Sequence, residues 1–283
     1  MVSASTRPAA SPEIGKSVLA AGIRTNYLEA GSGAPVVMIH GSGPGVTAFA
    51  NWRLAIGPLS SRFRVLAPDI VGFGYTERPA GAEWGMDLWL RHIIGFLDAL
   101  DLPKVHLVGN SFGGALALAV AARHPERVER LVLMGSVGVP FALTEGLDAV
   151  WGYEPGLENM RRLIGVFAHD DSLMTEQLVQ SRHEASTRPG FHESFAAMFP
   201  APRQRPIERL ATPDDQIRRL THETLVVHGR EDRVIPLSNS LRLHELIPRS
   251  QLHVFGQCGH WTQIEHAGRF VRLVGDFLAE DRA

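Results

Sequence analysis

A glycine-rich turn between an apolar run and a helix-forming run is the feature that most constrains this chain. Residues 109–114 read GNSFGG; they follow VHLV at 105–108 and precede a run of alanine, leucine and valine at 115–122. A strand, a G-x-S-x-G turn and a helix together form a nucleophile elbow, in which the serine projects from a tight turn. Ser111 is therefore a candidate nucleophile, against the simpler reading of a strand–helix turn that happens to contain a serine.

A serine hydroxyl needs a general base and a carboxylate that orients this base, and in elbow enzymes the acid and then the histidine follow the serine along the chain. An apolar run at 224–227 leads into a turn that holds Glu231 and Asp232 and is closed by Pro236. A further strand-like run at 251–255 leads into GQCGHW, which contains His260. We assign Asp232 as the orienting acid, with Glu231 as the alternative, and His260 as the base.

The chain has thirteen histidines, so one of them could stand at the expected place of the base by chance. None shows the H-E-x-x-H spacing of zinc ligands, and we predict no metal site and no cofactor. Only His40 and His260 stand beside glycine-rich turns after strands, and only His260 follows the serine. Cys258 is an alternative nucleophile, but it does not lie on an elbow.

The apolar residues 36–39 run into HGSGPG at 40–45, a turn that can present backbone N–H groups. In elbow hydrolases, one donor to the oxyanion comes from such a loop and the other from the residue after the nucleophile. These donors are the N–H groups of Ser42 and Phe112, unless the loop is a plain turn.

Bulk properties exclude several classes of protein. The 283 residues have a formal net charge of −2 and no basic stripe, so we expect no nucleic-acid partner. No apolar stretch is long enough to span a bilayer, and the N-terminus lacks a secretory pattern. The single cysteine excludes an internal disulfide and fits a reducing compartment. We therefore expect a cytoplasmic protein that does not bind membranes.

Strand and helix signals alternate along most of the chain, and the strands are continuous apolar runs of the kind found in parallel sheets buried on both faces. We expect a leader at 1–15 that is flexible, an α/β core at 16–138 and 207–283, and a helical lid at 139–206. Helices are expected at 52–60, 86–100, 115–122 and 263–278 in the core, and at 143–153, 157–167, 173–185 and 191–199 in the lid.

Several segments together resemble the meta-cleavage product hydrolases of the α/β-hydrolase superfamily. They are HGSGPGVT at 40–47, APD at 67–69, GNSFGG at 109–114, GQCGHW at 256–261, and the lid segments 144–153 and 188–195. The resemblance extends from about residue 11 to residue 280. Asn before the serine, SGPG after His-Gly, and Trp after the histidine are more particular than the elbow itself.

The resemblance implies an α/β-hydrolase fold, with a mostly parallel sheet of eight strands flanked by helices. It implies hydrolysis of a C–C bond in 2-hydroxy-6-oxo-hexa-2,4-dienoates, such as 2-hydroxymuconic semialdehyde, to 2-hydroxypenta-2,4-dienoate and a small acid. Asn51, Asn110 and Trp261 match positions that hold the dienoate, and Arg188 matches the arginine that binds its carboxylate. The family also implies a homo-oligomer, a dimer or larger.

Phe49 stands where close relatives are expected to have tryptophan, so packing under the oxyanion loop is expected to differ. Two other functions stay open: a carboxylesterase, which needs neither Asn110 nor Arg188, and a ligand sensor that does not catalyse. The sequence also leaves open the C6 substituent, and whether Ser111 forms an acyl-enzyme or activates water to give a gem-diol.

Overall fold

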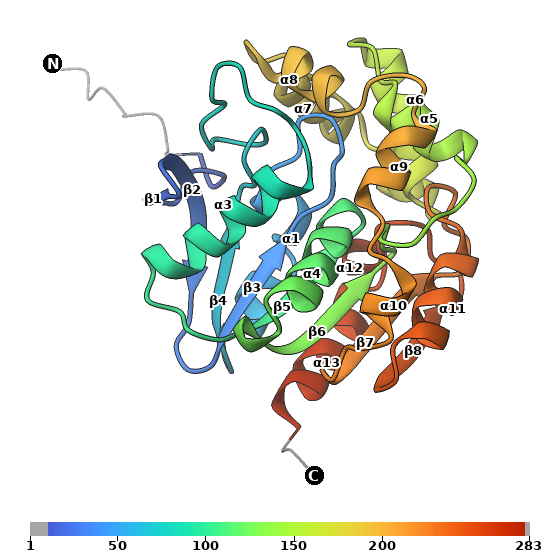
Figure 1. The fold of residues 1–283 in the computed structure, drawn as a ribbon. Coiled ribbons are helices and arrows are strands. Elements are labelled where there is room, and N and C mark those ends of the chain that lie inside the picture. Colours follow the sequence, from blue (N-terminus) through green and yellow to red (C-terminus); the bar gives the residue numbers. More distant parts are fainter. Residues whose placement is uncertain (1–10, 281–283) are drawn as a thin grey trace, which may run out of the picture.

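Within residues 11–280, the part of the chain that the structure describes, eight strands form one sheet in this computed structural model (Figure 1). They are β1 (Lys16–Ala20), β2 (Ile23–Ala30), β3 (Pro35–Ile39), β4 (Arg64–Pro68), β5 (Val105–Asn110), β6 (Val128–Met134), β7 (Thr224–Gly229) and β8 (Ser250–Phe255). Their order is β1-β2-β4-β3-β5-β6-β7-β8. The hairpin β1–β2 and the pair β2–β4 are antiparallel, and all the other pairs are parallel. The expected fold class is confirmed.

The parallel register brings the carboxyl ends of the central strands to one edge of the sheet. Ile39 at the end of β3 pairs with Gly109 of β5, and Gly109 pairs with Leu133 of β6. Strands β5 and β7 are buried along their whole length. The loops that follow these strands therefore start side by side, and ligands of open α/β sheets bind at this edge.

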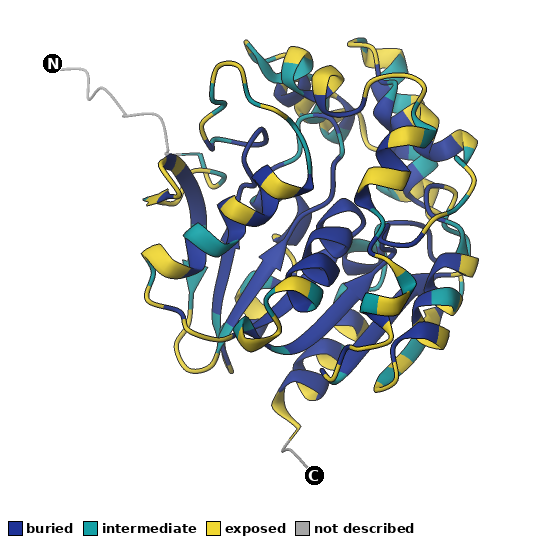
Figure 2. Cartoon of the chain, in the orientation of Figure 1, coloured by how far each residue is buried: buried dark blue, intermediate teal, exposed yellow. Residues whose placement is uncertain are grey.

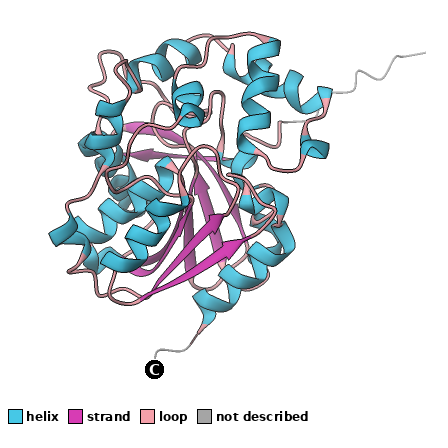
Figure 3. Cartoon of the chain, turned by 90° about the vertical axis from the view of Figure 1, so that its right-hand side faces the viewer, coloured by secondary structure: helices cyan, strands magenta, loops and turns pink. Residues whose placement is uncertain are grey.

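Helices cover both faces of the sheet, and the strands lie between them (Figure 3). These helices are α1 (Ala48–Trp52), α2 (Ile56–Leu59), α3 (Met86–Ala99), α4 (Phe112–Arg123), α10 (Asp214–Ile217), α11 (Leu237–Leu246), α12 (Thr262–Glu265) and α13 (Ala267–Ala279), with a 3₁₀ turn η1 (Pro125–Arg127) before β6. One apolar cluster joins α3, α4 and α11 to the sheet, and a second joins α1, α2 and α13 to the opposite face. Figure 2 shows that exposed residues are confined mainly to the outer surfaces of the helices and to loops.

A helical block between β6 and β7 lies beyond the carboxyl ends of the strands (Figure 1). It contains α5 (Glu145–Trp151), α6 (Leu157–Phe167), η2 (Asp171–Leu173), α7 (Glu176–Ser186) and α8 (Phe191–Met198), and α9 (Gln204–Leu210) leads back toward the sheet. Four of these helices lie where the sequence predicts lid helices. The apolar residues of the block belong to the same cluster as one face of the sheet, so the lid and the core share one interior.

Two of the predicted helices are wrong in detail. The helix expected at 52–60 is confined to α2, and α1 already ends at Trp52; Pro58 lacks an N–H group and fits only within the first turn of a new helix. The helix expected at 263–278 is interrupted at His266, which has φ −122° and ψ 38°. Trp52 was expected to pack, and it does: it is buried and stacks on Phe270 at 6.3 Å between ring centroids.

Two expected boundaries also need correction. The limit between lid and core at 206–207 falls inside α9, because Pro206 lies in the first turn of that helix, where a proline is tolerated. Residues 1–10 of the expected leader lie outside the described residues. Its last part is not a free tail, because the side chain of Asn26 in β2 donates to the carbonyl of Glu13 at 2.9 Å and accepts from the N–H of Gly15 at 2.9 Å.

Candidate active site

Ser111 occupies a strained turn between β5 and α4. Its backbone has φ 56° and ψ −116°, a conformation that side chains other than glycine rarely adopt and that is concentrated at functional sites. Gly113 permits the turn, because a Cβ there would lie 2.3 Å from the carbonyl oxygen of Ile39. Sequence and geometry therefore agree on a nucleophile elbow at this position.

Asp232 follows β7 and His260 follows β8, and the two side chains meet. Their contact is a hydrogen bond of 2.7 Å between Nδ1 of His260 and Oδ2 of Asp232. The other carboxylate oxygen of Asp232 accepts from the N–H groups of Val234 at 2.7 Å and Ile235 at 2.9 Å. Glu231, the alternative acid, instead bonds to the N–H of Cys258 and to Arg230. We call Ser111, Asp232 and His260 the candidate triad.

The electrostatics around the acid favour its ionised form. Burial alone would raise the pKa of Asp232, but the hydrogen bond and charge interaction with His260, together with nearby His228, lower it below its ordinary value. Nε2 of His228 lies 3.6 Å from Oδ2 of Asp232. Burial also raises the pKa of the Cys258 thiol to about 12, so this cysteine stays protonated and is a poor nucleophile.

The loop after β3 holds the first expected oxyanion donor in place. The N–H of Gly41 donates to Oδ1 of Asn51 at 2.8 Å, and the hydroxyl of Ser42 accepts a 2.9 Å hydrogen bond from the indole of Trp151 in the lid. Phe112, the second expected donor, is the first residue of α4, so its N–H has no acceptor within the helix. The Trp151 contact was missed from the sequence, where nothing local distinguishes this tryptophan from a packing residue.

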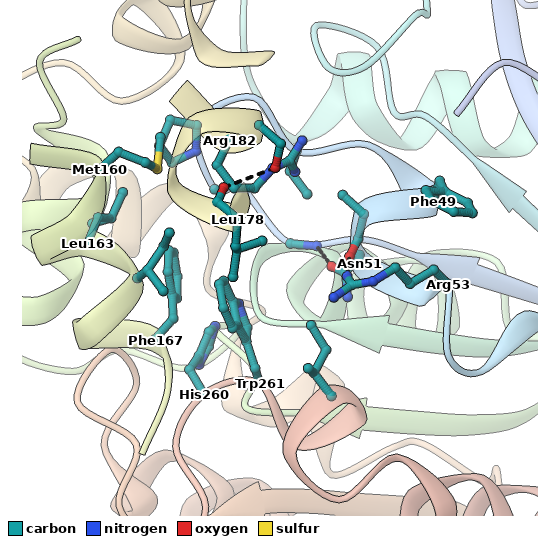
Figure 4. Close-up of a pocket in the computed structure, with 18 of the residues that line it drawn as sticks. Phe49, Asn51, Arg53, Met160, Leu163, Phe167, Leu178, Arg182, His260 and Trp261 are labelled. Atoms are coloured by element: carbon teal, nitrogen blue, oxygen red, sulfur yellow. Dashed lines mark hydrogen bonds between the residues drawn. The ribbon is translucent and has the colours of Figure 1, made fainter. Parts of the chain in front are cut away.

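A cavity of about 680 Å³ separates the strand ends from the lid. Ser42, Asn51, Asn110, Ser111, Arg188, His260 and Trp261 all contribute to its lining. Asp232 and Phe112 are not part of this lining, which for Asp232 fits an acid that lies behind the base. In Figure 4, apolar lid residues such as Met160 and Leu163 lie on one side of the cavity and Asn51 and Arg53 on the other.

Two amide side chains in the cavity wall form a hydrogen bond with each other, and each has one polar atom without a partner among the described residues. Nδ2 of Asn110 donates to Oδ1 of Asn51 at 3.1 Å. Nδ2 of Asn51 and Oδ1 of Asn110 are buried and have no partner among the described residues. Buried polar groups are normally satisfied, so a donor and an acceptor are available to a ligand here. Trp261 is next to His260 and stacks on Phe167 at 5.0 Å between ring centroids.

Two arginines of the helical block, Arg182 and Arg188, line the cavity, and in Figure 4 Arg182 and His260 lie at opposite ends of the cavity. Arg188 lies in the turn between α7 and α8, and its Nη2 is 3.2 Å from Oε2 of Glu13. Arg182 in α7 is 3.5 Å from the other oxygen of the same carboxylate. We call Glu13, Arg182 and Arg188 the arginine end. Neither Glu13 nor Arg182 was predicted, and half-buried Phe49 also lines the cavity.

The lid and the loop of His260 are joined by a set of backbone contacts. The N–H of His260 donates to the carbonyl of Phe167 at the end of α6, at 2.7 Å. The carboxylate of Glu265 accepts from the N–H groups of Gly259 at 2.7 Å, His169 at 2.7 Å and Asp170 at 2.9 Å. The position of the base therefore depends on the lid as well as on β8.

Residues 11–280 contain neither a metal-binding cluster nor a membrane-spanning helix. No cluster of three or more His, Cys, Asp or Glu side chains in this part of the chain could hold a metal ion. No helix among these residues is long and apolar enough to cross a membrane.

Comparison with known proteins agrees with the geometry. The model of the alpha/beta hydrolase fold family matches residues 34–267. A 2-hydroxymuconate semialdehyde hydrolase of Pseudomonas sp. strain CF600 is 64% identical over 273 residues, which are 96% of each chain. A 2-hydroxy-6-oxo-2,4-heptadienoate hydrolase of Pseudomonas putida is 62% identical, over 95% of this chain and 98% of the relative.

Among solved structures, a mutant of the meta-cleavage product hydrolase CumD from Pseudomonas fluorescens IP01, in complex with acetates, superposes with a TM-score of 0.93. It is 61% identical, and the match covers 94% of this chain and 98% of that one. The fold, the elbow and these similarities together place the chain in the alpha/beta hydrolase family, among the meta-cleavage product hydrolases.

Proposed function

We propose that this protein hydrolyses the C–C bond of 2-hydroxy-6-oxo-hexa-2,4-dienoates to 2-hydroxypenta-2,4-dienoate and a small carboxylic acid. The observation that carries the proposal is a cavity with a candidate triad at one end and an arginine end at the other. An elongated substrate with a reactive carbonyl and a distant carboxylate matches that polarity. The relatives named above for 2-hydroxymuconate semialdehyde and 2-hydroxy-6-oxo-2,4-heptadienoate support the same substrate class.

The chemistry assigns each member of the candidate triad a role. Cleavage of the C–C bond needs a carbon leaving group, so the dienol first becomes its keto form by protonation of carbon, and His260 carries this proton. Ser111 then acts at the C6 carbonyl, and His260 accepts a proton as base while Asp232 holds its ring and stabilises the imidazolium. Water then either hydrolyses an acyl-enzyme formed on Ser111 or adds directly to the carbonyl to give a gem-diol.

The developing oxyanion at C6 is bound by the N–H groups of Ser42 and Phe112. Preorganised donors of this kind stabilise a transition state by about 3–4 kcal/mol each. The hydrogen bond from Trp151 to Ser42 supports this assignment, because it fixes the loop that carries one donor. The lid thus contributes to the reaction without touching the reacting carbon.

The dienoate part of the substrate is held by Asn51, Asn110 and Trp261, and its carboxylate by Arg188. The unpartnered amide atoms of the two asparagines support the first assignment, since the oxygen at C2 of the substrate could form hydrogen bonds with them. A guanidinium can bind a carboxylate through two parallel hydrogen bonds. The related CumD mutant named above is itself complexed with acetates, which are small carboxylates.

The first experiment follows the yellow absorbance of the dienolate. Purified protein is mixed with 2-hydroxymuconic semialdehyde and with its 6-methyl and 6-isopropyl analogues, and p-nitrophenyl acetate serves as the ester control. We expect fast decay of the dienoates and slow ester turnover, with the semialdehyde and the methyl ketone ahead of the isopropyl ketone. Rapid ester turnover with inert dienoates would make the protein a carboxylesterase. Tight dienoate binding with no turnover of either would favour a ligand sensor.

We also propose that the protein acts in the cytoplasm as a homo-oligomer, a dimer or larger. The single cysteine supports a reducing compartment, and the family resemblance supports assembly. Light scattering coupled to size-exclusion chromatography tests the assembly directly, and a mass of one chain would contradict it.

A further inference from the structure

The segment before β1 reaches into the wall of the cavity and is fixed there. Two hydrogen bonds of the Asn26 side chain hold the backbone at and just after Glu13, one to the carbonyl of Glu13 and one from the N–H of Gly15. Nδ2 of Asn26 also donates to the buried carboxylate of Asp69 at 2.8 Å. The backbone at Glu13 is therefore attached to the sheet, and its side chain is a built part of the cavity.

The carboxylate of Glu13 is shared by partners from separate parts of the chain. Oε1 accepts from the hydroxyl of Thr47 at 3.2 Å and lies 3.5 Å from Arg182. Oε2 accepts from the hydroxyl of Tyr75 at 3.1 Å and from Nη2 of Arg188 at 3.2 Å. The Glu13 side chain is only 14% exposed, as is that of Arg182. So many contacts hold the carboxylate in place and argue against its displacement by a ligand.

These contacts fix one half of the Arg188 guanidinium and leave the other half free. The guanidinium carbon lies 4.7 Å from the centroid of the Tyr75 ring and 5.7 Å from that of Phe191. Nη2 is bonded to Glu13, whereas Nη1 is buried and has no partner among the described residues. An oriented guanidinium loses less entropy when it binds a carboxylate than a mobile one does.

We propose that Glu13 is a positioning residue that presets Arg188 for the substrate carboxylate and neutralises one of the two charges of the arginine end. This inference rests on the proposed function, in which Arg188 binds that carboxylate. Arg182 and Arg188 carry two positive charges and Glu13 one negative charge, so the arginine end itself has a net positive charge. Arg53 and Glu184 add one charge of each sign to the cavity lining.

The test compares Glu13→Gln with Glu29→Gln. Glu29 is a matched control because its side chain is 13% exposed and also bridges two cations, Lys16 at 2.8 Å and Arg64 at 2.7 Å, yet it does not line the cavity. We expect Glu13→Gln to lower the ratio of dienoate to ester kcat/KM about tenfold, mainly through the KM of the dienoate. Glu29→Gln should leave this ratio at the parent value. An unchanged ratio in Glu13→Gln overturns the inference.

A double variant separates positioning from a general loss of structure. If Glu13 acts through Arg188, then Glu13→Gln has no further effect on the dienoate KM once Arg188→Gln is present, whereas additive losses overturn the inference. If Arg188→Gln lowers dienoate and ester turnover equally, then the proposed role of Arg188 fails instead. Tyr75→Phe removes one bond to Glu13 and keeps the ring; a fall in the ratio of about twofold is expected, and no fall counts against Glu13 even if Glu13→Gln does not fold.

Discussion

The two ends of the cavity are built in different ways. Ser111 directly follows β5, and Asp232 and His260 lie in the loops that follow β7 and β8, in the parallel part of the sheet. The arginine end is assembled from the segment before β1, from α7, and from the turn between α7 and α8. Strand register places reactive groups accurately, whereas the arginine end depends on side chains that hold one another. The candidate triad and the group proposed to bind the substrate carboxylate therefore have different structural sources in this protein.

The largest expected effect lies at the strand-borne end. Ser111→Ala removes the nucleophile and should lower kcat for the dienoate by about 10⁶-fold, while the dienoate still binds. Stopped-flow absorbance measures both quantities, because binding changes the dienolate spectrum before turnover. Substantial residual turnover would mean that the elbow serine is not the nucleophile and that the contrast between the two ends is misplaced.

Asp232→Asn should be the next most severe change. It keeps the shape of the side chain but no longer stabilises the imidazolium, so kcat should fall about 10⁴-fold. Glu231→Gln is the matched control, because Glu231 is the neighbouring acid and bonds to Cys258 rather than to His260. Comparable losses in the two variants would contradict the assignment of Asp232.

At the arginine end, Arg188→Gln should raise the KM of the dienoate about 10²-fold. The ester control has no carboxylate and should lose much less. Steady-state kinetics on both substrates test this, and equal losses would show that Arg188 supports the fold instead of recognising a carboxylate. Such a split between the two substrates would assign recognition of the substrate carboxylate to the arginine end.

Trp151→Phe tests whether the lid also reaches the catalytic end. Loss of the indole N–H frees the hydroxyl of Ser42, and kcat should fall about tenfold with little change in KM. Trp52→Phe is the control, since the indole N–H of Trp52 is buried and has no partner among the described residues. A fall in both variants would point to general packing.

The smallest effect concerns stability. Burial lowers the pKa of His40 to about 4 and that of His92 to about 3, and it also lowers the pKa of His228, whereas burial raises the pKa of Asp69 to about 6. Between about pH 4 and 6.5 the unfolded chain binds protons on these histidines that the native state does not. Asp69 opposes this, because in this pH range it binds a proton in the native state but not in the unfolded chain. The three histidines outweigh this one group, so the unfolded state binds more protons in total than the native state does.

The free energy of unfolding should therefore fall as the pH drops below about 6.5, by roughly 2 kcal/mol per pH unit near pH 5. Urea unfolding at several pH values measures this slope. His92→Gln should reduce the slope by the equivalent of about one bound proton. A flat profile between pH 5 and 6.5 would show that the histidines are not held neutral.

The sequence signals for the candidate triad are local. Ser111, Asp232 and His260 each follow an apolar run, and their order along the chain limits the possible partners. The arginine end offers no such signal: Glu13 lies in a stretch rich in serine, proline and alanine, and its partner Arg188 is 175 residues away. Trp151 and Ser42 are 109 residues apart, and only the folded lid joins them.

The helix errors have a similar cause. Pro58 and Pro206 are compatible with a helix only in its first turn, so a proline can mark either the end of one helix or the start of the next. Helical periodicity alone did not separate these two cases. Arg188 itself was predicted only because its surroundings resemble a known family, since an arginine before a proline is usually a surface residue.

The bonds between the lid and the loop of His260 also bear on how such enzymes can be recombined. A lid transplanted from a relative would have to reproduce the backbone at 167–170, where Phe167 and two N–H groups engage His260 and Glu265. A graft that ends before this stretch would keep the old base geometry, and one that crosses it would alter the base together with the substrate range. The practical crossover point for chimeras therefore lies within the lid but outside residues 167–170.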